Sequence, residues 1–173
     1  MFDETNLNRQ VLSNEGNLGR SKAEEAVLQM KLINSEVRID PVYAFIDESN
    51  AAELIRGFDA VVDALDNISS RKTLEHACEA ENIPLVHGAI AGWNGQVSVV
   101  MPGDGTIAAV YEGEEEKCEE VLTGNPYFTP AVVSAIEVAE TVKLLLGREG
   151  SLMSRMLIID LLHHDYETID FGE

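Results

Sequence analysis

Short apolar runs and amphipathic stretches alternate through the first hundred residues, and this alternation restricts the fold more than any other feature. The run Asp59-Ala-Val-Val-Asp-Ala-Leu-Asp66 is short, apolar and closed by an acid, which is typical of a parallel strand buried on both faces. Residues 37–42, 83–90 and 96–101 are further strand candidates, and residues 69–81 have helical spacing. Strands that alternate with helices predict an α/β domain with a mainly parallel sheet and flanking helices.

Start and stop signals define the N-terminal part of the chain. Residues 1–20 lack apolar periodicity and predict an irregular segment. Ser21 and Glu24 then form a capping box for a helix that is expected to end at Asn34. A second, short helix is predicted over residues 51–56.

The C-terminal third contains an acidic stretch, a long helix and two strands. Residues 112–120 contain six Glu in nine positions, so we expect residues 112–125 to form a solvated, mobile loop. The elements predicted after this loop are a helix over residues 129–146 and two strands, which can pair antiparallel, over residues 156–162 and 166–171. We expect residues 1–173 to form a single domain.

Charge and composition exclude several classes of protein. The 31 Asp and Glu outnumber the 12 Lys and Arg, which gives a net charge of −19 and argues against nucleic-acid binding through a basic face. No apolar run approaches the roughly 20 residues that cross a bilayer, and the polar, acidic N-terminus is not a signal peptide. Two cysteines are too few for a disulfide framework. We therefore expect a cytoplasmic protein without a membrane segment.

Four short clusters hold the polar side chains that suit chemistry: Asn6-Leu-Asn-Arg-Gln10, Gly19-Arg-Ser-Lys22, Asp63-Ala-Leu-Asp-Asn67 followed by Arg71, and Gly88-Ala-Ile-Ala-Gly-Trp-Asn-Gly-Gln-Val97. Lys22 begins a capped helix, and a helix N-terminus with a lysine suits a phosphate group. Asp66 follows a buried strand, where open α/β sheets bind ligands, and its carboxylate can hold Mg²⁺ together with phosphate oxygens. Arg9 offers a fork of donors to a phosphate.

Each of these residues also has a purely structural interpretation. Lys22 can be a solvated cation at an exposed helix start, and Arg9 can be an ordinary surface residue of a polar loop. Asp66 and Asn67 can form a turn that caps the following helix. Taken one at a time, these residues do not decide between binding and structure.

The order of the clusters is more specific than any single cluster. The succession N-L-N-R-Q, G-x-x-K, D-x-x-D-N and G-A-x-x-G-x-x-G-Q-V resembles the ThiF/MoeB/HesA family, the bacterial relatives of ubiquitin-activating enzymes. The resemblance spans residues 2–102. It continues more weakly over residues 126–146, where Glu137 or Glu140 with Lys143 fits the E-x-x-K pattern of a late helix in that family.

The resemblance implies a Rossmann-like fold and an adenylyltransferase that uses ATP and Mg²⁺. The implied substrate is the C-terminal glycine carboxylate of a ubiquitin-like sulfur-carrier protein, which attacks the α-phosphate of ATP. The nucleotide-binding residues carried over from the family are Asn6, Arg9, Gln10, Lys22, Asp66 and Asn67. Among them, Arg9, Lys22 and Asp66 would carry catalysis, Asp66 as the Mg²⁺ ligand. A homodimer and a role in thiamine or molybdopterin-type sulfur metabolism are implied in the same way.

Three departures from the family pattern shape these expectations. Neither G-x-G-x-x-G nor G-x-x-x-x-G-K-[ST] occurs in the chain, so we expect a sheet that lacks at least one N-terminal βαβ unit of about 30 residues. No C-x-x-C pair is present, so no zinc is expected. Cys118 lies between the sheet and the late helix, where some members of the family place a reactive cysteine, and it is the candidate thiol.

Two other functions stay open at this point. A chain without the Gly-rich loop can be a truncated or degenerate relative that acts as a binding or structural protein. An enzyme of this class can also activate a small-molecule or tRNA-bound carboxylate. The net negative charge argues modestly against the tRNA version, because repulsion from nucleic acid would have to be overcome locally.

Overall fold

A computed structural model describes residues 1–113 and 124–171, and these residues fall into two compact units, Met1–Phe45 and Ile46–Glu173. Each unit is built around its own set of buried side chains. In the first unit these are Phe2, Asn6, Asn17 and Glu25, most of which are polar.

The first unit consists of two capped turns and one helix. The turns η1 (Glu4–Asn6) and η2 (Glu15–Asn17) are single turns of 3-10 helix. Helix α1 (Lys22–Ile33) begins at the predicted cap, where Ser21 Oγ accepts a hydrogen bond from the Glu24 amide at 3.4 Å, and it ends at Asn34. Both predicted ends of this helix are confirmed, because capping is a local property of the sequence.

The strand predicted over residues 37–42 is wrong. The structure assigns no strand to residues 38–46, and their side chains Val42, Tyr43 and Phe45 are exposed. A strand requires a neighbour that accepts and donates backbone hydrogen bonds, and no ladder of the described residues includes this segment. An alternating pattern of apolar and polar residues was therefore not enough to predict a strand in this segment.

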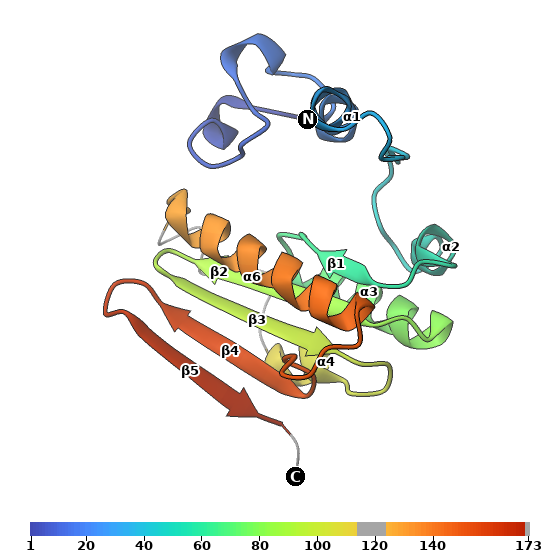
Figure 1. The fold of residues 1–173 in the computed structure, drawn as a ribbon, viewed down its shortest axis with the longest axis vertical. Coiled ribbons are helices and arrows are strands. Elements are labelled where there is room, and N and C mark those ends of the chain that lie inside the picture. The colour runs from blue at the N-terminus through green and yellow to red at the C-terminus, as the bar shows by residue number, and fades with distance from the viewer. Residues whose placement is uncertain (114–123, 172–173) are drawn as a thin grey trace. The chain divides into compact units, whose positions relative to one another are not determined.

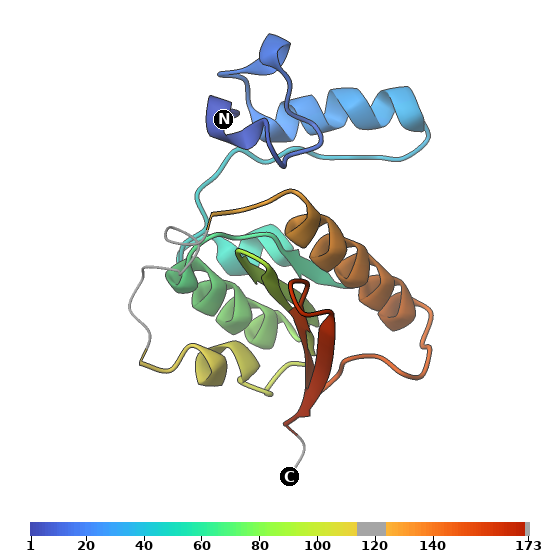
Figure 2. The same cartoon turned by 90° about the vertical axis from the view of Figure 1, so that its left-hand side faces the viewer.

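The second unit is a five-stranded sheet with helices on both faces (Figures 1 and 2). Its elements are α2 (Ala51–Ile55), β1 (Val61–Asp63), α3 (Ile68–Glu81), β2 (Leu85–Ala91), β3 (Asn94–Val100), α4 (Thr106–Val110), α6 (Phe128–Leu145), β4 (Arg155–Asp160) and β5 (Asp165–Asp170). The strands lie in the order β1-β2-β3-β4-β5. Strands β1 and β2 are parallel, and every later pair is antiparallel.

The α/β class is therefore confirmed, and so is the antiparallel closing pair. The expectation of a mainly parallel sheet does not hold for the strands described, because β2 turns directly into β3 as a hairpin and only β1 and β2 are parallel. Local signals explain the positions of the helices. Asn67 Oδ1 accepts a hydrogen bond from the Ser70 amide and caps α3, and Asn82 ends that helix in the left-handed conformation at φ 55°. The expectation that residues 1–173 form one domain stays a prediction, as does the mobility of residues 112–125, most of which lie outside the described residues.

Two apolar layers enclose the sheet. On one face, α3 and α4 pack on Leu85 and Val100, and Cys78 is part of this layer. On the other face, α6 packs on Val97 and Ile159 through Val133. None of the helices described is both long and apolar enough to cross a membrane.

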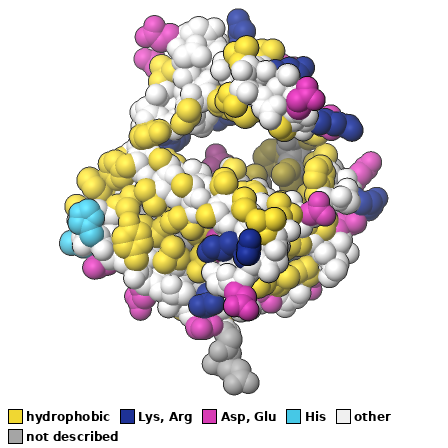
Figure 3. All heavy atoms as spheres, in the orientation of Figure 1, with side chains coloured by type: hydrophobic (Ala, Val, Ile, Leu, Met, Phe, Trp, Pro, Cys, Tyr) yellow, Lys and Arg dark blue, Asp and Glu magenta, His cyan; other side chains and the backbone are white. Residues whose placement is uncertain are grey.

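Helix α6 also carries a second apolar stripe, which faces away from the sheet. Val138, Val142, Leu145 and Leu146 are each about half exposed or more, and their spacing places them on one side of the helix. Figure 3 shows hydrophobic side chains gathered on this face of the molecule. An exposed stripe of this kind usually contacts another surface.

Candidate functional site

The turn between β1 and α3 holds the carboxylates of the D-x-x-D-N cluster, and the two carboxylates lie in opposite environments. Asp63 ends β1 and is 1% exposed, and its Oδ1 accepts a hydrogen bond from the Leu65 amide at 2.8 Å. Asp66 is exposed at the carboxyl end of the strand. The first carboxylate therefore shapes the turn, and the second is exposed to solvent.

A buried polar network lies beneath this turn. His87 is the register partner of Asp63 on β2, and its Nδ1 lies 2.7 Å from Asp63 Oδ2. Arg71 Nε, on α3, lies 3.4 Å from the same oxygen. Gln96 and Tyr111 complete the network, and all five side chains except Gln96 are at least nine-tenths buried. The sequence analysis assigned no role to these partners of Asp63, because nothing local to the sequence reveals which residues face each other across a sheet.

The contacts of α6 show whether Glu137 or Glu140 pairs with Lys143 in the E-x-x-K pattern. Glu140, which is 2% exposed, binds both Lys143 Nζ and the Leu152 amide, the latter at 2.8 Å. It therefore ties α6 to the segment that leads into β4. Glu137 does not take part in that pair. Its carboxyl group is buried over Gly88, and burial, followed by the nearby negative charge of Asp63, raises its pKa to about 8.

The N-terminal site residues belong to the first unit. Asn6 is buried and its side chain accepts a hydrogen bond from the Asp3 amide, so it is part of the η1 cap. Arg9 donates to the Thr5 carbonyl at 2.8 Å and to Asn8 Oδ1 at 3.0 Å. The backbone amide of Gln10 donates to the Asn6 carbonyl. These three residues are held together by one loop.

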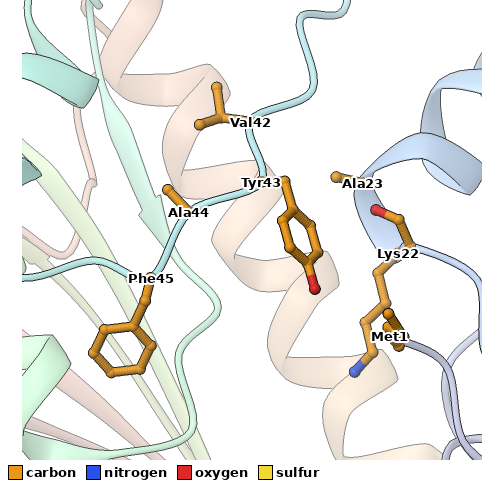
Figure 4. Close-up of a pocket in the computed structure, with 8 residues that line it drawn as sticks. Met1, Lys22, Ala23, Val42, Tyr43, Ala44 and Phe45 are labelled. Atoms are coloured by element: carbon orange, nitrogen blue, oxygen red, sulfur yellow. The ribbon is translucent and has the colours of Figure 1, made fainter.

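Lys22 lies at a pocket of about 420 Å³ within the first unit (Figure 4). The ammonium group is at the exposed start of α1, 5.9 Å from the centre of the Phe2 ring. The pocket is lined by Met1, Ser21, Lys22, Ala23, Val42, Tyr43, Ala44 and Phe45. A cation at a helix N-terminus beside aromatic rings is suited to an anionic ligand with a planar group.

The two units divide the predicted site. Asn6, Arg9, Gln10 and Lys22 belong to the first unit, and Asp66 and Asn67 belong to the second. Their convergence on one nucleotide stays a prediction. Asp66 fits Mg²⁺ chemically, because this ion takes only one or two protein carboxylates and completes its shell with water and phosphate oxygens. Among the described residues no three Asp, Glu, His or Cys side chains form a metal centre.

The two cysteines differ in what the structure shows. Cys118 lies outside the described residues, so its predicted role as a thiol stays a prediction. Cys78 is buried on α3 at 3% exposure, and burial together with the charges of Asp63 and Glu75 raises the pKa of its thiol to about 12. A thiol with that pKa is protonated at neutral pH and is not nucleophilic.

These features define the fold class of the protein. A parallel β–α–β unit with an exposed acid after its first strand, extended by antiparallel strands, is a Rossmann-like α/β domain. A crystal structure of Escherichia coli MccB with MccA-N7isoASN shares this fold with a TM-score of 0.80 at 16% identity, over 100% of this chain and 55% of that one. The chain belongs to the ThiF family, whose model matches residues 1–173.

Two curated relatives give the same family. The SAMP-activating enzyme E1 of Haloferax volcanii is 34% identical over 99% of this chain, which covers 64% of that protein. The molybdopterin-synthase adenylyltransferase of Haemophilus influenzae is 32% identical over 90% of this chain, which covers 65% of that protein. The chain thus spans slightly less than two thirds of the length of these relatives.

Proposed function

We propose that this chain is part of an enzyme that adenylates the C-terminal carboxylate of a ubiquitin-like carrier protein in sulfur metabolism. The observation that carries the proposal is the match to the SAMP-activating enzyme over 99% of the chain. The match includes the turn that exposes Asp66 and the helix start that exposes Lys22. The proposal extends to a homodimer in the cytoplasm and to a carrier of the thiamine or molybdopterin type.

The reaction joins one carboxylate oxygen to the α-phosphorus of ATP. As that bond forms, the bond from the α-phosphorus to the bridging oxygen of the β-phosphate breaks, and pyrophosphate leaves. The attacking carboxylate is already ionised at neutral pH, so the enzyme needs no general base. Its task is to position the reactants and neutralise charge.

Three side chains would supply the charge. Lys22 and Arg9 would bind phosphate oxygens, for which an ammonium group at a helix start and a guanidinium fork are suited. Asp66 would hold Mg²⁺. Mg²⁺ held by Asp66 would supply positive charge against the negative charge that develops on the leaving pyrophosphate.

The test is ATP–pyrophosphate exchange that depends on the carrier protein. We expect Arg9→Ala, Lys22→Ala and Asp66→Ala each to lower the exchange rate by about 10²- to 10³-fold, because each removes one charge from the transition state. Lys31→Ala and Asp59→Ala, which remove exposed charges outside the proposed site, are the matched controls. An exchange rate that is the same in all five variants would refute the site assignment.

A second candidate function follows from the absence of the G-x-G-x-x-G motif in this chain. Without such a loop the chain can serve as a non-catalytic binding protein. Isothermal titration with Mg-ATP separates the two functions. Heat of binding that is lost in Asp66→Ala supports the enzyme, and no heat with the wild-type protein supports the binding role.

A further inference from the structure

Arg71 follows the D-x-x-D-N cluster in the sequence, and the site described above assigns it no chemistry. We propose that Arg71 is a positioning residue. It holds the turn on which Asp66 lies and connects that turn to Tyr111, the residue that immediately precedes the acidic stretch beginning at Glu112. The contacts that carry this proposal all lie within the second unit. Only its consequence for Mg²⁺ rests on the function proposed above.

On one side, Arg71 holds the turn. One of its terminal nitrogens donates to the Leu65 carbonyl, and its Nε forms an ion pair with Asp63 Oδ2 at 3.4 Å. Asp63 Oδ1 in turn binds the Leu65 amide. The residue directly before Asp66 is thus held at both its amide and its carbonyl, so the backbone there has little freedom to move.

On the other side, Arg71 holds Tyr111. Its second terminal nitrogen donates to the Tyr111 hydroxyl at 2.9 Å, and the guanidinium carbon lies 5.8 Å from the centre of the tyrosine ring. Lys72, the next residue on α3, donates to the Tyr111 carbonyl at 2.9 Å. Tyr111 directly follows α4 and precedes Glu112, where the acidic stretch begins.

The Tyr111 hydroxyl is the group at which the other side chains of the network meet. It accepts hydrogen bonds from Arg71 and, at 2.9 Å, from Gln96 Nε2. The His87 ring lies between Asp63 and this hydroxyl. Its Nδ1 is 2.7 Å from Asp63 Oδ2, and its Nε2 is 3.4 Å from the hydroxyl oxygen. The hydroxyl therefore contacts Arg71, Gln96 and His87 together.

Burial gives the network its stiffness. Arg71 is 3% exposed, Asp63 1% and Tyr111 7%, so water does not replace a contact that is lost. A buried polar group without a partner is costly, which is why a buried network keeps one arrangement or shifts as a unit. A change at Tyr111 is therefore transmitted to the Leu65 peptide, and from there to Asp66.

The first test measures motion and needs no catalysis. Tyr111→Phe removes the hydroxyl and keeps the ring. We expect amide deuterium exchange to become about 2- to 10-fold faster both in the peptide over residues 63–70 and in the peptide over residues 106–113, as the loss of one net hydrogen bond predicts. The control is Tyr166→Phe, which removes the hydroxyl of an exposed tyrosine on β5; it should change neither peptide.

Arg71→Lys is the second variant, and it decides the matter if Tyr111→Phe does not fold. It keeps the charge but has no fork to span Leu65 and Tyr111, so both peptides should again exchange faster. Faster exchange confined to residues 106–113, or no change in either peptide, would overturn the proposal.

The second test reads the consequence for the proposed reaction. In Tyr111→Phe, the Mg²⁺ concentration for half-maximal ATP–pyrophosphate exchange should rise about 3- to 10-fold, while the rate at saturating Mg²⁺ stays within about twofold of wild type. A merely destabilised fold would lower the active fraction without changing the Mg²⁺ requirement. If deuterium exchange becomes faster in both peptides but the Mg²⁺ concentration for half-maximal activity does not change, the proposed effect of Tyr111 on Mg²⁺ binding at Asp66 is refuted. If the wild-type protein shows no exchange activity, the proposed function fails and the deuterium result still stands.

Discussion

At the scale of the residue, Glu137 is a buried carboxyl group whose pKa is well above its ordinary value. Its carboxyl group is 7% exposed and lies over Gly88, and its Oε1 has no hydrogen-bond partner among the residues that the structure describes. Burial raises its pKa to about 8, the charge of Asp63 adds to the rise, and Arg71 opposes it. The folded protein therefore binds a proton at neutral pH that the unfolded chain releases, which means that folding is weakened at high pH.

We expect Glu137→Gln to remove this loss of folding stability at high pH. Between the ordinary carboxyl pKa of 4.5 and the raised value of about 8, wild-type stability should fall as pH rises, because the folded state binds more protons than the unfolded state. The free-energy advantage of the variant should grow by on the order of 3 kcal/mol from pH 5 to pH 8. Urea unfolding at four pH values measures it. The exposed Glu79→Gln is the control, and parallel pH curves for the wild type and Glu137→Gln would contradict the prediction.

At the scale of the element, α6 packs closely against the sheet at two glycines. A Cβ on Gly88 would lie 2.4 Å from Glu137 Cδ, and a Cβ on Gly95 would lie 2.5 Å from Val133 Cγ2. Real Cβ atoms do not approach other atoms so closely, so the absence of two side chains sets how near the helix comes. The glycines of the G-A-x-x-G-x-x-G cluster that lie beneath α6 thus have a packing role, which their spacing in the sequence does not reveal.

Gly95→Ala should therefore destabilise the protein by about 1–3 kcal/mol, the cost of overpacking a tight contact. Val133→Ala removes the methyl group that blocks the new Cβ, so the double variant should be more stable than the sum of the two single losses allows. We expect a coupling energy of about 1 kcal/mol or more, measured by urea unfolding of the four proteins. Strict additivity would show that the helix does not rest on Gly95 through Val133.

At the scale of the whole molecule, charge and apolar surface act in opposite directions. The net charge of −19 keeps copies of the chain apart. The exposed stripe of α6, formed by Val138, Val142, Leu145 and Leu146, favours their association. Salt weakens the first effect, because the screening length falls from about 10 Å at 0.1 M to about 3 Å at 1 M.

We therefore expect the average mass of this 173-residue chain, measured by light scattering, to rise with NaCl concentration above its low-salt value. Val142→Glu should abolish most of the rise, since it places a charge in the middle of the stripe. Val11→Glu, at a residue of the first unit that is 79% exposed, should leave the rise unchanged. A mass that does not depend on salt, or equal behaviour of the two variants, would mean that the stripe of α6 does not mediate association.

Properties that depend on near neighbours in the chain could be predicted from the sequence alone. Ser21 and Asn34 bound α1 as expected, because a cap and its partner amide lie within one helical turn. Apart from the strand expected over residues 37–42 and helix α4, which was not predicted, the order of the described strands and helices followed from apolar patterning. The antiparallel closing pair followed in the same way, and motif order gave the family.

Only the tertiary structure decided which distant residues face each other. The pairing of Asp63 with His87, the contact of Arg71 with the Tyr111 hydroxyl and the hydrogen bond from the Leu152 amide to Glu140 all depend on strand register and helix packing. The same limit explains the strand wrongly expected over residues 37–42. A strand exists through the hydrogen bonds of its neighbours, and an alternating pattern specifies a buried face without specifying the neighbour.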